Sequence, residues 1–368
     1  MSLRRAVLML TVLVLTACTN QSIERESKGG IPYTVETLAE GLDVPWEMDI
    51  AADGRIFFTE RPGSIRVIVN EEVLPEPVIR FDAPFHSEGE GGLLGLALDP
   101  QFEENHYLYV YHTYEKDGEI LNRVLRLKEQ DNRATVDRVL LDGLAGERNH
   151  NGGRIKIGPD GYLYITVGDR YEPELAQQEQ SLGGKILRIG LDGTIPYDNP
   201  FPGSPVYSYG HRNPQGLAWH PETSQLYASE HGQSAHDEIN VIEPGANYGW
   251  PLIEGDETLE SRPELKKPLL HSGDETWAPS GMTFVSNGPW KGQMLVANLR
   301  GSQVLKLTLG YNDGTGVTHV DYLFPEWGRI RNVYEGSDGS LYIMTNNQDG
   351  RGRPNPGDDK LLRLKPKE

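Results

Sequence analysis

Short apolar runs recur along the chain, each preceded by a turn and followed by a polar loop. The five clearest are DGRIFFTERPGSIRVI from Asp53, DGYLYITVGD from Asp160, SQLYASEHG from Ser224, GQMLVANLRGSQVLKLTL from Gly292 and DGSLYIMTNN from Asp338. β-branched and aromatic residues fill these runs, whereas stretches with the 3.6-residue period of an amphipathic helix are scarce. The pattern predicts an all-β protein built from a repeated turn–strand unit.

Repetition of such a unit every few tens of residues is typical of a β-propeller. The chain beyond residue 17 would supply about 58 residues to each of six blades, which leaves room for functional loops. Seven blades remain an alternative, and so does a β-sandwich, although a sandwich gives no reason for the repetition. Since no linker-like interruption follows Gly30, we predict one domain, a six-bladed β-propeller over residues 31–368.

The first residues have the pattern of an export signal, with Arg4 and Arg5, an apolar stretch over 6–15 and then Leu-Thr-Ala-Cys. This ending resembles a bacterial lipobox, so we predict a signal peptide over residues 1–17 and a lipidated Cys18. Residues 18–30 would form the tether. A plain secretory signal is the alternative. Because Thr19 is not aspartate, the resemblance places the anchored protein at the periplasmic face of the outer membrane.

Charge and cysteine content narrow the possible partners. The formal net charge is −19, and it becomes about −21 once residues 1–17 are removed. Such a charge argues against nucleic acid or an anionic membrane surface as a partner, and leaves the lipid as the only membrane contact. Cys18 is the only cysteine, which excludes an internal disulfide.

Loops after the repeated strands hold unusual polar clusters, and a propeller brings such loops together. His150 lies among small and amide residues in NHNGG, where its imidazole is suited to proton transfer. The segment HRNPQG reads as a turn, in which Pro214 restrains Asn213 and Gln215 beside Arg212. A guanidinium next to two amides can bind a planar anion. Structural roles for both loops remain alternatives.

Two further clusters indicate an anion and a cation. Arg329 and Arg331 would lie on one face of a strand, and with Arg300 they suggest an anionic ligand, unless they pair with neighbouring acids. The loops SEHGQ, DEIN and GANYGW are rich in oxygen ligands and contain no cysteine, which suits calcium better than a transition metal. Their spacing does not match an EF-hand loop.

Six motifs in order resemble the soluble quinoprotein glucose dehydrogenase and aldose sugar dehydrogenase family, and the likeness runs from about Leu42 to about Leu364. The motifs are GEGGLLGLALDPQF, HNGGRIKIGPDGYLYITVGD, GGKILRIGLDGTIPYDNPF, HRNPQGLAW, SEHG with DEINVI, and GANYGWP. The resemblance implies a six-bladed propeller that binds pyrroloquinoline quinone and calcium. Its implied activity is oxidation of aldoses at the anomeric carbon to lactones, with hydride transfer to the quinone.

Roles follow from the resemblance motif by motif. His150 matches the general base, and Asp169 matches a carboxylate that would orient it. The cofactor-binding positions are matched by Glu90, Arg212, Asn213, Gln215, Arg300, Arg329 and Arg331. Gly232 and Gln233 match backbone-carbonyl ligands of a calcium ion bound to the cofactor, whereas Glu238 and Tyr248 match ligands of a further calcium.

Three positions depart from the glucose dehydrogenases of this group. Arg300 replaces a lysine and Asn149 an aspartate, and both changes look like the aldose sugar dehydrogenase branch. Glu90 replaces a glutamine and would repel an anionic cofactor, unless an arginine such as Arg300 pairs with it or its pKa rises.

Two other functions stay open at this point, a calcium-dependent propeller lactonase or esterase and a non-catalytic glycan-binding lipoprotein. A nicotinamide cofactor is disfavoured, because GEGGLLG lacks the third glycine of the dinucleotide fingerprint and no helix follows it. The preferred sugar, the electron acceptor and the oligomeric state cannot be read from the sequence.

Overall fold

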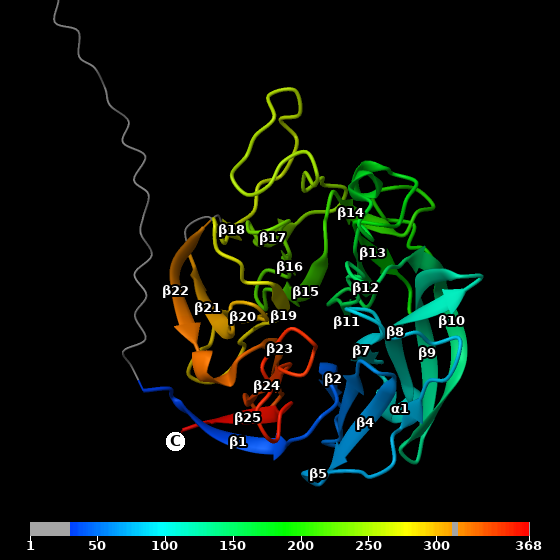
Figure 1. Ribbon diagram of the computed structural model, residues 1–368, viewed down its shortest axis with the longest axis vertical. Helices are drawn as coiled ribbons and strands as arrows, with labels where there is room; N and C mark the ends of the chain where they lie inside the picture. Colours follow the sequence, from blue (N-terminus) through cyan, green and yellow to red (C-terminus); the bar gives the residue numbers. More distant parts are fainter. Residues whose placement is uncertain (1–29, 311–315, 368) are drawn as a thin grey trace, which may run out of the picture.

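The computed structural model describes residues 30–310 and 316–367, and these form six antiparallel sheets arranged around a central axis (Figure 1). This confirms the predicted six-bladed β-propeller. The predicted signal peptide, Cys18 and nearly all of the tether lie outside the described residues. Within the described part, no helix combines the length and apolar character needed to cross a membrane.

Each blade has four successive strands from the axis to the rim. The inner strands are β2 (Pro45–Ile50), β7 (Leu93–Leu98), β11 (Ile155–Ile157), β15 (Pro214–Trp219), β19 (Pro279–Phe284) and β23 (Ile330–Glu335). The second strands are β3 (Ile56–Glu60), β8 (Tyr107–Lys116), β12 (Leu163–Val167), β16 (Leu226–Glu230), β20 (Met294–Asn298) and β24 (Leu341–Thr345).

The outer half of each blade completes the sheet. The third strands are β4 (Ser64–Val69), β9 (Glu119–Gln130), β13 (Lys185–Ile189), β17 (Glu238–Ile242), β21 (Gln303–Leu309) and β25 (Leu361–Pro366). The rim strands are β5 (Glu72–Val73), β10 (Arg133–Ala145), β14 (Val206–Tyr209), β18 (Leu270–His271), β22 (Val317–Leu323) and β1 (Tyr33–Ala39). The remaining elements are a short strand β6 (Ile79–Arg80), which pairs with β4, a helical turn α1 (Phe102–Asn105), and the 3₁₀ turns η1 (Pro173–Gln177) and η2 (Pro325–Trp327).

The hydrophobic core lies between neighbouring blades. Phe57 and Val67 of the first blade, for example, share a buried cluster with Leu108 and Leu125 of the second. Strands sandwiched in this way bury both faces, and all five residues of β12 are buried. The apolar runs are therefore continuous where a half-exposed sheet would alternate.

The five sequence repeats correspond to the second strands of five blades, β3, β12, β16, β20 and β24. The second blade does not show this repeat in the sequence, because its second strand, β8, starts at Tyr107, just after the helical turn α1. It therefore lacks the glycine or serine turn that marks the other five.

Pairing of the chain ends closes the ring. The N-terminal strand β1 forms the rim of the last blade, where Val35 lies opposite Leu364 of β25 (Figure 1). The last blade thus contains both ends of the described chain, which ties the first and last segments together without a disulfide.

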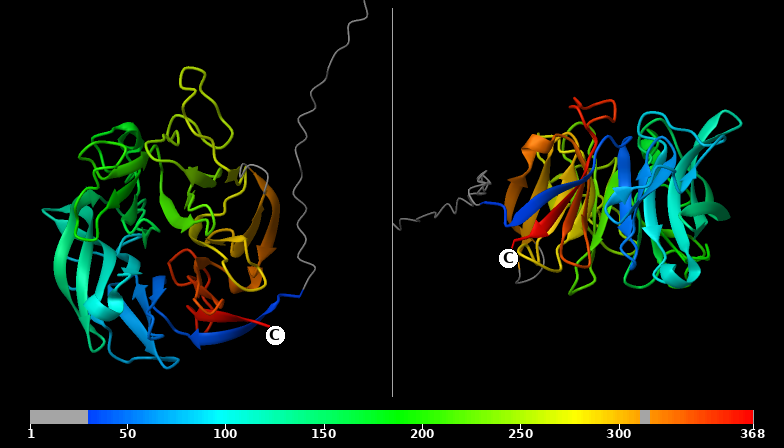
Figure 2. Two further views of the ribbon diagram at one scale, coloured as in Figure 1. Left: turned by 180° about the vertical axis from the view of Figure 1, so that it is seen from behind. Right: turned by 90° about the horizontal axis from the view of Figure 1, so that it is seen from below.

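Strand direction decides where the functional loops lie. Because neighbouring strands are antiparallel, every inner strand begins on the face where every second strand ends. Residues just before the inner strands therefore meet residues just after the second strands. In the side view, the strands run between the two faces of a disc, and loops form both faces (Figure 2).

Candidate active site

A cavity of about 1070 Å³ opens where these loops converge. All six blades contribute to its lining, for example through Arg61, Glu90, His150, Arg212, Arg300 and Arg329, in chain order. Of the thirteen residues predicted to be catalytic or ligand-binding, nine line this cavity: Glu90, His150, Arg212, Gln215, Gly232, Gln233, Arg300, Arg329 and Arg331. Tertiary folding therefore brings together side chains that are up to 241 positions apart, from Glu90 to Arg331.

The cavity is strongly basic in an acidic protein. Seven arginines line it against three acidic residues, Glu90, Asp237 and Asp349. The arginines are Arg61, Arg148, Arg212, Arg300, Arg329, Arg331 and Arg351. Such an excess of positive charge in a concave site favours a ligand with several negative charges.

Arg331 is the most deeply buried of these cations, with 3% of its surface exposed. Its guanidinium donates hydrogen bonds to the Gln215 side chain (2.7 Å) and to Asn346 (3.1 Å). It has no ion-pair partner among the described residues. Burial, with the nearby guanidiniums of Arg61 and Arg329, lowers the pKa of Arg331 to about 9, so the group is still charged at neutral pH.

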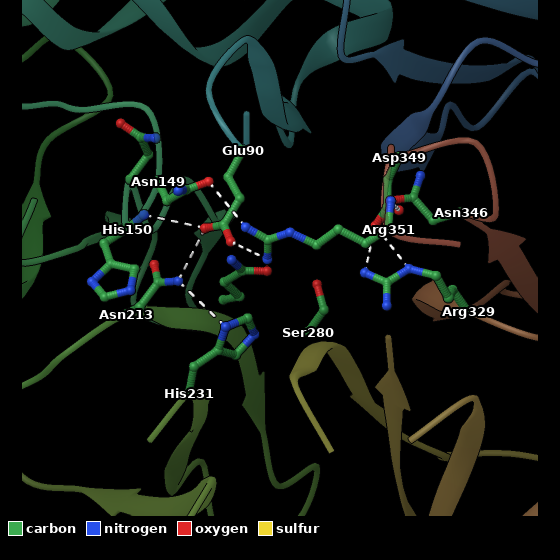
Figure 3. A network of polar contacts seen from close by, with 12 residues as sticks. Glu90, Asn149, His150, Asn213, His231, Ser280, Arg329, Asn346, Asp349 and Arg351 are labelled. Carbon is green, nitrogen blue, oxygen red and sulfur yellow. Dashed lines mark hydrogen bonds and ion pairs between the residues drawn. The ribbon is translucent and has the colours of Figure 1, made fainter. Parts of the chain in front are cut away.

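Arg329 lies in the same cavity, but its environment differs. It precedes β23, whose pairing with β24 is irregular between Ile330 and Asn332, so the simple strand alternation expected for the pair does not hold. Its Nε donates to the Asp349 carboxylate at 2.9 Å (Figure 3). Arg329 is therefore partly neutralised, whereas Arg331 is not.

His150 and Asp169 form a hydrogen-bonded pair beside the cavity. His150 Nδ1 lies 2.7 Å from Asp169 Oδ1, and both side chains are buried. Because a carboxylate can only accept, Nδ1 carries the proton and Nε2 keeps a free lone pair. Asp169 also accepts from Trp250 Nε1 (2.8 Å) and from the Tyr171 backbone N–H (3.0 Å). Three donors thus fix one carboxylate.

The backbone around the pair is unusual. His150 has a φ of 59°, in the left-handed region that residues with a Cβ seldom adopt. A Cβ on Gly168, the residue before Asp169, would lie 1.9 Å from the His150 carbonyl oxygen. Only glycine there lets the two segments approach, so the VGD motif is required by the geometry of the pair.

Glu90 lies opposite His150 and is held by several donors (Figure 3). It accepts from the His150 N–H (3.1 Å) and pairs with Arg351 (2.8 Å). Burial disfavours its charged form, but His231 and Arg351 outweigh burial and lower the pKa of Glu90 to about 2. The hypothesis of a raised pKa is wrong, and the pairing arginine is Arg351 rather than Arg300.

The HRNPQG segment is only partly a turn, because β15 begins at Pro214. Arg212 donates to the Gly232 carbonyl at 2.6 Å, and its Nε is buried without a partner. Asn213 accepts from the Gly152 N–H (3.0 Å) and approaches Glu90 without lining the cavity itself. The segment thus supplies one half-satisfied guanidinium and two buried amides.

The residues expected to hold calcium lie in two places. Gly232 and Gln233 line the basic cavity, whereas Glu238 and Tyr248 line a small adjoining gap, which Gly232 also lines. Burial and the neighbouring Glu230 raise the pKa of Glu238 to about 8. Within the described residues, His, Cys, Asp and Glu side chains form no group of three that could hold a metal, so a calcium site with one or two carboxylates would need further oxygen ligands, such as backbone carbonyls or the cofactor.

Among the cavity residues missed in the sequence are Arg61, Tyr171, Asp349 and Arg351. Asp349 and Arg351 follow β24 in the run NNQDGRGRP, and Arg61 follows β3. Each of the four lies just after a second strand, so the rule that loops after the repeated strands meet could have found them.

Comparisons with known proteins agree with this geometry. The family model described as "Glucose / Sorbosone dehydrogenase" matches residues 42–363. Aldose sugar dehydrogenase YliI of Escherichia coli is 31% identical, over 86% of this chain and 91% of its own. The structure of a putative oxidoreductase (glucose dehydrogenase) from Thermus thermophilus is 43% identical, with a TM-score of 0.84 over 90% of this chain and 99% of its own.

A further solved structure is the PQQ-bound form of aldose sugar dehydrogenase from Streptomyces coelicolor. It is 37% identical, with a TM-score of 0.80 over 90% of this chain and 98% of its own. Together, the family match over nearly all of the propeller, the shared fold and the histidine–carboxylate pair beside a cationic cavity lead to one assignment. The chain belongs to the glucose/sorbosone dehydrogenase family.

Proposed function

We propose that this protein is a quinoprotein dehydrogenase that oxidises aldoses at the anomeric carbon to lactones with pyrroloquinoline quinone as hydride acceptor. The observation that carries the proposal is the convergence of seven arginines and one free imidazole nitrogen on a single cavity. The name of the Streptomyces relative supports the choice of quinone, since that protein binds it.

The cavity residues fit a planar tricarboxylate. Arg331 has no carboxylate partner in the described chain, and the buried Nε of Arg212 has no acceptor. An anionic ligand would supply a counter-charge for Arg331 and an acceptor for Arg212 Nε. Arg329 would contribute less because Asp349 already pairs with it. Arg300, exposed at the cavity wall, would add a further cation.

The described residues fit calcium less directly than they fit the quinone. The Gly232 carbonyl already accepts a hydrogen bond from Arg212, so calcium at Gly232 and Gln233 would have to share that oxygen with the guanidinium or displace it. At the second site, the Tyr248 hydroxyl bonds to Val241 and Glu243, which leaves only its backbone carbonyl as a ligand. The raised pKa of Glu238 means that a cation beside its carboxylate would be stabilising.

The protein's own residues account for the proton. Nε2 of His150 would take the proton of the anomeric hydroxyl, while Asp169 holds Nδ1–H and stabilises the imidazolium that forms. The arginines would orient the anionic cofactor and offset its added negative charge. When bound, the quinone would supply the hydride acceptor and calcium a Lewis acid.

Reconstitution tests the proposal. Purified protein freed of cofactor is assayed with an aldose panel and an artificial dye, with quinone alone, calcium alone, and both. Activity is expected only with both. Activity with a nicotinamide cofactor, or none with any aldose, would overturn the dehydrogenase proposal. Lactone or ester hydrolysis would favour the lactonase, and sugar binding without turnover would favour the glycan-binding protein.

We also propose export and lipid anchoring at Cys18, which rests on the sequence alone. A Cys18→Ser variant is expected to move from the membrane fraction to the soluble fraction with unchanged specific activity, because a tethered lipid lies outside the propeller. Soluble wild-type protein in the periplasm would contradict this proposal.

A further inference from the structure

A second cavity of about 370 Å³ adjoins the basic one on the side of η1. The two cavities share four lining residues, His150, Tyr171, Arg212 and Gln233. The predicted base therefore lies at a junction and is reached from both sides. A ligand in the second cavity could thus meet the imidazole without displacing a ligand from the first.

The second cavity has the opposite charge. Glu174, Glu254 and Glu257 line it together with Asp169, and Arg212 is its only cation in the described chain. Asp169 is already held by three donors, so the three glutamates supply the unneutralised charge. The same imidazole thus faces a cationic chamber on one side and an anionic chamber on the other.

Its walls also include flat and apolar surfaces. The Tyr171 ring lies 4.0 Å from the His150 ring, centroid to centroid, and 53% of Tyr171 is exposed. Trp250, Pro173 and Pro251 complete the lining. Tyr171 has a φ of 62°, and its N–H is held by Asp169, so its position is tied to that of the base. Aromatic and acidic groups together suit a polyhydroxylated ring with an apolar face.

A ring nitrogen of His150 is available to a ligand here. The His150 side chain is 8% exposed, and its Nε2 has no hydrogen-bond partner among the described residues. This nitrogen is not one of the fully buried atoms without a partner, so it is open to the cavities that His150 lines, where a ligand hydroxyl can bond to it. Because His150 lines the second cavity, that hydroxyl can belong to a molecule bound there.

We propose that the acidic cavity is the sugar-binding chamber and that it selects substrates by charge. It admits neutral aldoses, prefers cationic 2-amino-2-deoxy aldoses, and rejects sugar acids and sugar phosphates. This proposal rests on the proposed function, in which His150 is the base. The same charge separation keeps the anionic cofactor in the arginine-lined cavity, since three carboxylates repel it from the second one.

Two double variants that have the same net charge test the proposal. Glu174→Gln/Glu257→Gln removes two cavity carboxylates and leaves Glu254, which accepts the Gln233 N–H. The control, Glu103→Gln/Glu222→Gln, removes two exposed carboxylates from loops between first and second strands, on the opposite face. Binding of glucosamine and glucose to the cofactor-free protein is measured at pH 6 by saturation-transfer NMR. Glucose 6-phosphate is tested only as a substrate of the reconstituted enzyme, in which the quinone would fill the arginine-lined cavity.

Wild-type protein and the control are expected to bind glucosamine more tightly than glucose and, once reconstituted, to oxidise glucose 6-phosphate least efficiently. In the cavity variant, the ratio of glucosamine affinity to glucose affinity should fall about tenfold, since each partly exposed charge interaction changes affinity a few-fold. In the reconstituted cavity variant, the ratio of kcat/KM for glucosamine to kcat/KM for glucose 6-phosphate should fall as well. An unchanged binding ratio in the cavity variant overturns the charge-selection proposal, whereas normal binding without turnover of any aldose counts against the proposed function instead.

Discussion

Replacing Asp169 by asparagine is expected to disable the predicted base while leaving the fold in place. The carboxylate accepts from three N–H groups: His150 Nδ1 and the Tyr171 backbone on Oδ1, and Trp250 Nε1 on Oδ2. An asparagine side chain has one acceptor oxygen and one NH₂ group, so it cannot satisfy both sides. In either orientation, two donors face each other.

The two orientations have different consequences. If the amide oxygen faces Trp250, the NH₂ group faces His150 and forces the proton from Nδ1 to Nε2, which removes the lone pair that accepts the substrate proton. If the oxygen faces His150, Trp250 Nε1 loses its partner at a cost of about 1–3 kcal/mol, and the imidazolium loses its counter-charge. Both routes lower turnover, by about 10²–10⁴-fold, the contribution of a positioned base.

The measurement is kcat with saturating quinone and calcium, beside an Asp338→Asn control in an exposed turn on the opposite face. Urea unfolding and far-ultraviolet circular dichroism establish that the variant is folded. ¹⁵N NMR of the histidine ring shows whether the proton has moved from Nδ1 to Nε2. If kcat of the folded variant stays within about threefold of wild type, Asp169 does not orient the base, and the reasoning is refuted.

Further predictions concern His150, Arg212, Glu90 and Glu238. His150→Ala should lower kcat by about 10²–10⁴-fold while quinone affinity stays near that of wild type. Arg212→Ala should weaken quinone binding more than it lowers kcat. Both are measured by quinone titrations and steady-state rates, and if both variants lose only quinone affinity, His150 is not the base. The ionised Glu90 carboxylate stabilises the folded state above pH 4.5, and this contribution is lost as pH falls toward its pKa of about 2. Between pH 7 and pH 3, the free energy of unfolding of wild type, measured with urea, should therefore fall by about 2 kcal/mol more than that of Glu90→Gln. Because Glu90 remains ionised from pH 6 to 8, its replacement should not alter the pH dependence of quinone affinity there, and a clear change would contradict the low pKa. Calcium should raise the melting temperature of wild type more than that of Glu238→Gln, and an equal rise in both would exclude Glu238 as a ligand.

Much of this protein could be predicted from its sequence alone. Continuous apolar runs behind glycine or serine turns indicated blades, because a strand packed between two sheets must be apolar on both faces. The rule that such loops converge on one face also brought His150, Arg212 and Arg331 into a single site. These features depend on local pattern and topology, which the order of residues specifies.

Other features were decided only by tertiary structure. Arg351 pairs with Glu90 across 261 positions, and no local pattern distinguishes it from Arg300 as the partner. The low pKa of Glu90 and the high pKa of Glu238 arise from neighbours contributed by other segments. Electrostatic energies depend on distances and burial in space, so charge at a site is decided by packing, whereas strand pattern is decided by sequence.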